Sequence, residues 1–167
     1  MGLVSTVLRV LQFLFTLIAT GLIGNVRATT ISAAGTSTAA INFAIFVLAL
    51  SWLALLYGLV IQFVSAIAIP VVSLVLDSLA TLFTFIAAVI LSAKLTSVNC
   101  GNYGSKHSGW IAYGSGDTEK RCREIQAGLV FMWFLFATFA ATLFFTYREF
   151  RRGGGSVRGP NMSQIGV

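Results

Sequence analysis

The fold is decided by residues 69–93, which read IPVVSLVLDSLATLFTFIAAVILSA and contain a single charged side chain, Asp77. A helix needs about 20 mainly apolar residues to cross about 30 Å of hydrocarbon at 1.5 Å per residue. The run lacks the alternation of polar and apolar residues that a barrel strand requires. Backbone groups in lipid must also bond within their own segment. The run is therefore predicted to be a transmembrane helix that begins close to Pro70, since proline is tolerated in a first turn.

Three further stretches have the same character, and the first of them carries one charge, Arg9. These predicted spans cover about residues 3–26, 41–64 and 126–147. The sequence therefore predicts an all-α integral membrane protein with a bundle of four transmembrane helices. The expected organisation is a transmembrane domain over residues 1–150, which includes one large loop at 94–125, and a basic then polar tail at 151–167.

The composition supports this class and restricts the chemistry. Of the 167 residues, 57% are hydrophobic and only 10% are charged, whereas soluble domains carry about 25% charged residues. The chain holds one histidine, two cysteines and five acidic residues. Catalytic and metal sites need several such groups to converge, so we expect no enzyme activity, no cofactor and no metal. We also expect no nucleic-acid partner.

The two cysteines decide the expected orientation. Five cations lie on the side of the termini and six on the other side, so the positive-inside rule does not choose between the two topologies. Cys100 and Cys122 both lie in the large loop, and a disulfide between them requires an oxidising compartment. That pairing places the loop outside the cell and both termini in the cytosol. The alternatives are two unlinked thiols, or a metal site with His107 that lacks a fourth ligand.

Asp77 needs a partner, because a carboxylate at the bilayer centre costs about 2.5–3.5 kcal/mol even on lenient scales. Arg9 lies in the same half of the membrane on this topology, which favours a buried charge pair between the two. The alternative is that Arg9 reaches the headgroups while Asp77 is protonated or bonded to hydroxyls. Ser73, Thr81 and Thr84 share the helix face of Asp77. We expect no ion pathway, because no second ionisable residue lies deeper in any span.

Basic residues follow the last span closely, so they are expected to contact anionic lipid of the inner leaflet. They are Arg148, Arg151, Arg152 and Arg158. The alternative is that they serve only as a topological stop signal. Small residues such as Ala54 and Gly58 let helices approach closely. Such spacing is typical of packing within one bundle, and self-association of the chain is the alternative.

Several short segments resemble a known group, the fungal MARVEL-domain proteins of the non-classical export protein family, which are associated with eisosomes. The resemblance covers nearly all of the spans and the long loop. It rests on Leu8-Arg9-Val10, Phe13-Leu14-Phe15, Pro70, Leu76-Asp77, Phe83-Thr84-Phe85, Cys100, Gly114-Ser115-Gly116, Arg121-Cys122-Arg123 and Gln126-Ala127. The first loop and the tail depart from the family pattern.

The resemblance implies a multi-pass plasma-membrane protein with cytosolic termini. It further implies residence in microdomains that contain sterol and sphingolipid, eisosome-type membrane proteins as partners, and a response to sphingolipids. On this basis the expected function is a non-enzymatic organiser of lipid microdomains. The alternative is a small transporter or a component of non-classical protein export.

Overall fold

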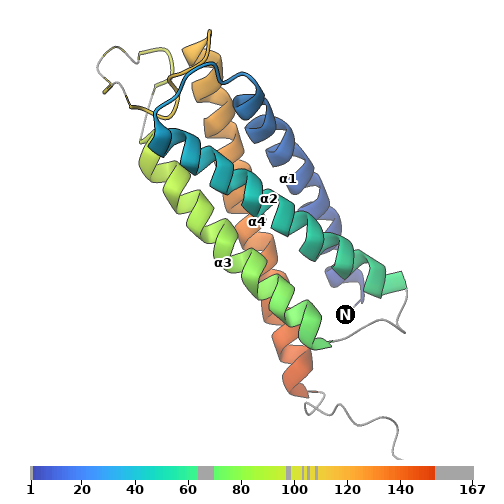
Figure 1. The fold of residues 1–167 in the computed structure, drawn as a ribbon. Coiled ribbons are helices and arrows are strands. Elements are labelled where there is room, and N and C mark those ends of the chain that lie inside the picture. Colours follow the sequence, from blue (N-terminus) through green and yellow to red (C-terminus); the bar gives the residue numbers. More distant parts are fainter. Residues whose placement is uncertain are drawn as a thin grey trace, which may run out of the picture.

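The computed structural model describes residues 2–63, 70–96, 99–102, 104, 106–107 and 109–152. Within these residues the regular elements are four α-helices, shown in Figure 1. They are α1 (Gly2–Ala28), α2 (Gly35–Phe63), α3 (Pro70–Leu95) and α4 (Thr118–Arg152). All four are long and apolar enough to cross a membrane. The protein is therefore an all-helical membrane protein with four candidate spans.

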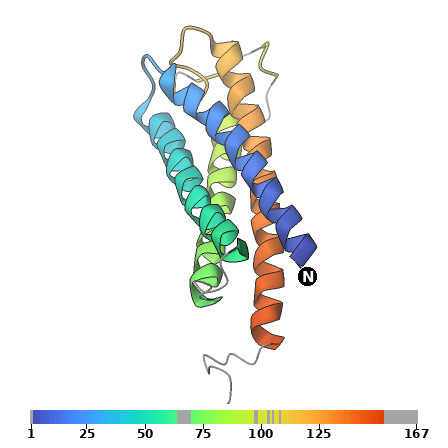
Figure 2. The same cartoon turned by 90° about the vertical axis from the view of Figure 1, so that its right-hand side faces the viewer.

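Successive helices run in opposite directions and close into a ring, in which each helix packs against two neighbours. Figures 1 and 2 show one end of the bundle where α1 begins and α4 ends, and an opposite end that carries the long loop. These are called the terminal end and the loop end below. The most extensive packing joins α4 to α1 and to α3. α4 runs past the other helices at the terminal end (Figure 2).

The helices extend beyond the predicted spans, most clearly in α4. Asp117 accepts a hydrogen bond from the backbone N–H of Lys120 (3.0 Å), which is the bond of an N-cap residue. Glu119 follows in the first turn, where a negative charge suits the helix dipole. α4 therefore begins two turns before the predicted span, because charged residues are excluded from lipid but not from a helix. α2 likewise begins at Gly35 instead of residue 41.

Small residues let the helices approach closely in the core. A Cβ atom added to Gly128 of α4 would lie 2.7 Å from Cδ1 of Ile23 in α1, so these two helices touch through the glycine. Buried alanines continue this pattern in α2 and α3. Ala54 is among them, so the small face of α2 that contains Ala54 and Gly58 is directed into the bundle.

Candidate functional site

The strongest polar feature of the described residues is a charge pair inside the terminal half of the bundle. Arg9 of α1 donates two hydrogen bonds to Asp77 of α3, from Nη1 to Oδ1 (2.9 Å) and from Nη2 to Oδ2 (2.8 Å). Arg9 is 4% exposed and Asp77 is 1% exposed. The paired geometry matches the planar fork of a guanidinium to the two carboxylate oxygens. It joins two helices that do not otherwise pack against each other.

Gln12 extends this pair to α4. Its side-chain carbonyl accepts a hydrogen bond from Nη1 of Arg9 (3.0 Å). Its amide donates to the hydroxyl of Thr142 (2.8 Å) and to the backbone carbonyl of Thr138 (3.2 Å). Gln12 is fully buried, so these bonds replace the ones that water would make. The result is one connected network across α1, α3 and α4.

The fourth helix contributes a glycine instead of a polar side chain. A Cβ atom added to Gly58 of α2 would lie 2.3 Å from Cζ of Arg9, far inside the contact distance of two carbon atoms. The guanidinium group therefore lies directly against the α2 backbone. Because Arg9 is also fixed by Asp77 and Gln12, it cannot move aside freely. Together these residues form what is called the Arg9 network: Arg9, Gln12, Gly58, Asp77, Thr138 and Thr142.

The hydroxyl groups on the polar face of α3 do not bind the carboxylate of Asp77. The hydroxyls of Thr81 and Thr84 donate to carbonyls of their own helix, at Asp77 and Ala80 (2.6 Å each). Ser73 is buried, and its Oγ has no hydrogen-bond partner among the residues that the structure describes. The carboxylate of Asp77 is thus held by Arg9, not by these hydroxyls. Arg9 is buried instead of extended to the headgroup region.

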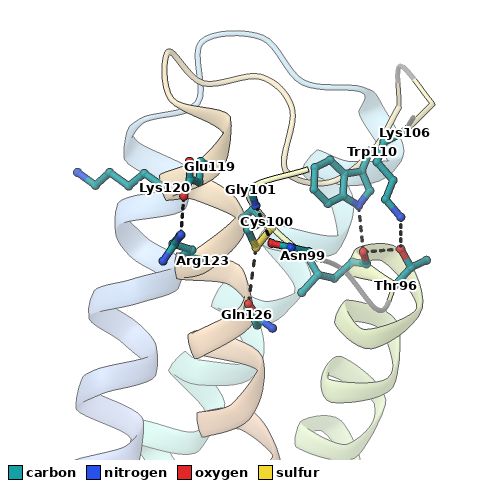
Figure 3. Close-up of a disulfide and its surroundings, with 12 residues drawn as sticks. Thr96, Asn99, Cys100, Gly101, Lys106, Trp110, Glu119, Lys120, Arg123 and Gln126 are labelled. Atoms are coloured by element: carbon teal, nitrogen blue, oxygen red, sulfur yellow. Dashed lines mark hydrogen bonds and ion pairs between the residues drawn. A yellow bond between two sulfur atoms is a disulfide. The ribbon is translucent and has the colours of Figure 1, made fainter. Parts of the chain in front are cut away.

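A second cluster closes the loop end. Cys100 and Cys122 form a disulfide, with 5.7 Å between their Cα atoms, which ties the segment after α3 to the start of α4 (Figure 3). Trp110 is buried and donates from Nε1 to the backbone carbonyl of Leu95 (3.0 Å) at the end of α3. A free carbonyl at a helix terminus is thereby satisfied. The described part of the long loop is therefore packed on the ends of the helices and is called the cap below.

Arg121 is the central cation of this cap. It is 2% exposed and donates to the carbonyls of Val26 (2.9 Å) and Ile111 (3.2 Å) and to the hydroxyl of Thr30 (2.7 Å). A cation is favoured at the carbonyl end of a helix, and here it caps α1. On the sequence alone, Arg121 is counted only as one of six cations on the loop side and is given no structural role. In the sequence, Arg121 differs from the other loop-side cations only by its place in the Arg-Cys-Arg element.

The cap also holds the link between α1 and α2. The backbone N–H groups of Ile31 and Ser32 both donate to the carbonyl of Gly114 (2.8 and 3.2 Å). Gly114 has a φ of 101°, a region open to glycine. A Cβ there would lie 1.9 Å from the carbonyl oxygen of Ser32. Glycine is therefore required at this close approach of two backbones.

The loop contains a disulfide and not the alternative site, in which Cys100, Cys122 and His107 would bind a metal ion. Both sulfur atoms belong to the disulfide, and His107 is exposed. Among the described residues, no group of three histidine, cysteine, aspartate or glutamate side chains is arranged to hold a metal ion.

The arginines after the last span lie on the final turns of α4 or beyond them. Arg148 and Arg151 are exposed, and each guanidinium lies over an aromatic ring of the same helix: Phe144 at 5.5 Å and Tyr147 at 5.9 Å from the ring centre. Arg152 is the last residue of α4. Arg158 and the rest of the tail lie outside the described residues.

Comparison with known proteins identifies relatives along the whole chain. The MARVEL family, described as a membrane-associating domain, matches residues 2–145. The chain is 30% identical to Non-classical export protein 2 of Saccharomyces cerevisiae over 179 aligned positions, which cover 99% of both chains. It is 36% identical to Non-classical export protein 102 of Candida albicans over 151 positions, which cover 90% of this chain and 85% of the relative. No solved structure matches.

Proposed function

Because this chain belongs to the MARVEL family and is related to the fungal non-classical export proteins, we propose that it is a non-enzymatic organiser of lipid microdomains in the plasma membrane. In this role the helix surfaces collect particular lipids, and the bundle itself provides a stable scaffold. The proposed partners are sphingolipid or sterol, anionic lipid of the inner leaflet, and eisosome-type membrane proteins. Self-association of the chain belongs to the same proposal.

The proposed orientation places both termini in the cytosol and the cap outside the cell. The disulfide between Cys100 and Cys122 supports it, since such bonds persist in oxidising compartments. The terminal arginines then face the inner leaflet, whose anionic lipids attract cations.

The observation that carries the proposal is the closed Arg9 network. Its charged and polar groups bond to one another and are nearly fully buried. A transport route would instead present polar groups to a water-filled path. Groups that are already satisfied and packed against a glycine backbone hold helices in place, which favours a scaffold over a transporter. The alternative, a component of non-classical protein export, rests on the names of the relatives.

The test is to image the full-length tagged chain in a fungal cell before and after sphingolipid synthesis is inhibited. We expect patches at the plasma membrane that disperse on depletion, while a tagged unrelated four-span protein does not change. A uniform distribution before treatment would contradict the proposal. Loss of secretion of a leaderless cargo on deletion of the gene, together with a tagged chain that forms no patches, would favour export.

A further inference from the structure

A groove runs between α3 and α4 on the outside of the terminal half, with a volume of about 380 Å³. Its α3 wall is formed by Leu74, Ser78 and Thr81. The two hydroxyls of this wall donate to carbonyls of their own helix, from Ser78 to Leu74 and from Thr81 to Asp77 (2.6 Å each). Neither hydroxyl therefore has a hydrogen atom left to donate to a ligand. The wall offers hydrocarbon and satisfied oxygen atoms, a surface that suits an acyl chain.

The α4 wall is formed by Ala140, Leu143, Phe144 and Tyr147. Ala140 lies deepest in the membrane and leaves room through its small side chain, while Tyr147 is nearest the terminal end. The rise from Ala140 to Tyr147, a separation of seven residues, is about 10 Å along the helix. The groove is thus long enough to hold part of one acyl chain parallel to the helices, with Tyr147 at the end that lies towards the terminal end of the bundle.

Two cations lie beside this end of the groove, over two of the aromatic rings that line it. Arg148 lies over Phe144 and Arg151 lies over Tyr147, because residues three, four and seven apart share a helix face. Among the described side chains the ion pairs join Arg9 to Asp77 and Arg123 to Glu119, and Arg148 and Arg151 are both exposed. A guanidinium stacked on a ring still has its N–H edge available for a phosphate.

We propose that this groove binds one acyl chain of an anionic phospholipid and that Arg148 and Arg151 bind its headgroup phosphate and carboxylate. The inference deepens the proposed function, on which it rests, by naming a lipid class and its site. The apolar walls require a chain, which free phosphate lacks. The two exposed cations favour a negative headgroup, which a zwitterionic lipid satisfies only in part.

The test uses the purified full-length chain in vesicles of phosphatidylcholine. The probes are phosphatidylserine and phosphatidylcholine analogues with the same diazirine-bearing acyl chain, each added at the same low fraction. We expect the serine lipid to label peptides 74–81 and 140–147 at least about five-fold more than the choline lipid, the ratio that one cation near a membrane supplies. Equal labelling by the two lipids would reduce the groove to non-selective lipid contact and overturn the proposal.

Variants separate the headgroup site from the groove. Arg148→Gln with Arg151→Gln should bring the ratio close to one, whereas Arg148→Lys with Arg151→Lys should keep most of it. The matched control is Lys120→Gln with Arg123→Gln, which removes two exposed cations at the loop end and should change nothing. A serine preference that survives the glutamine pair would overturn the headgroup assignment. Ala140→Leu, which fills the deep end, should lower labelling by both lipids at peptides 140–147; unchanged labelling would overturn the groove.

Other occupants give distinct results that also overturn the proposal. If the tail fills the groove, labelling appears only after residues 153–167 are deleted. If a second copy fills it, peptides 140–147 crosslink to protein instead of lipid. The outcome is independent of patch formation in cells. Selective labelling without patches would refute only the organiser function, and patches without selective labelling would refute only the lipid site.

Discussion

Replacing Asp77 by alanine should test the Arg9 network most directly. The change removes two charge-assisted hydrogen bonds, of 2.9 and 2.8 Å, and leaves Arg9 buried. Breaking a buried pair by removal of one partner costs about 3–5 kcal/mol in soluble proteins. Arg9 keeps one bond, to Gln12 (3.0 Å), and local water softens the cost in a bilayer. The expected loss in the free energy of unfolding is therefore about 3 kcal/mol, at the lower end of that range.

The double variant Arg9→Leu with Asp77→Leu should recover more than half of this loss, because neither charge then remains in lipid. The coupling energy from the double-mutant cycle should be about 4 kcal/mol or more, because each single change leaves the other charge buried without its partner. Asp77→Asn should fall between wild type and Asp77→Ala, since its carbonyl oxygen still accepts a bond from Arg9. The matched control is Thr84→Val. Thr84 is equally buried but bonds only to its own helix, so its loss should have little effect.

The assay is reversible unfolding by steric trapping in lipid discs, which reports a free energy for each variant under the same conditions. Additive losses of the two single leucine variants would refute the pair as an energetic unit. A loss of less than about 1 kcal/mol for Asp77→Ala would refute the burial argument itself, because that is the size of an exposed ion pair. Either result would mean that the contact between Arg9 and Asp77 contributes little to the free energy of unfolding.

Three further outcomes are expected. Gly58→Ala should destabilise the chain by about 1–3 kcal/mol through overpacking, and by clearly less when Arg9 is already leucine; equal effects in both backgrounds would contradict the contact. Cys100 and Cys122 should resist alkylation in intact cells until a reductant is added, and reduction should cost about 3 kcal/mol for their separation of 22 residues; labelling without reductant would refute the external cap. Arg121→Met should cost at least about 2 kcal/mol by leaving several oxygen atoms of the cap without a donor, and Arg121→Lys should recover only part of it in thermal unfolding.

The fold was predictable from length and polarity, because four long apolar runs admit only one backbone solution in lipid. The pairing of Arg9 with Asp77 was likewise open to prediction. The reason is energetic: two isolated charges in spans of the same bundle are costly apart. The limits of α4 were not predictable in this way. A hydropathy pattern reports where lipid ends, whereas Asp117 and the charged turn after it determine where the helix begins.

Sequence reasoning missed the rest of the Arg9 network for a physical reason. One uncharged Gln12 in an apolar run does not by itself indicate a buried hydrogen-bond network. Its position three residues after Arg9 does place both residues on one helix face. The role of Gly58 depends on how α2 is rotated and which side chain crosses it, and one sequence contains neither. The role of Arg121 was not predictable because a cation in a polar loop is normally solvated. Only the folded cap buries it.

The two ends of the bundle are stabilised by independent means. The Arg9 network and the Arg121 cap are separated by about 25 Å along α1, the rise of the 17 residues from Arg9 to Val26. Contacts so far apart share no partner, so perturbations at the two ends should add. The terminal end depends on buried charge, which salt screens weakly, and the loop end depends on a bond that reductant breaks. Because α1 is fixed by an arginine at each end, either loss alone leaves it attached to α4. The bundle can therefore lose one anchor and still keep its helix order, which is what a scaffold within the membrane requires.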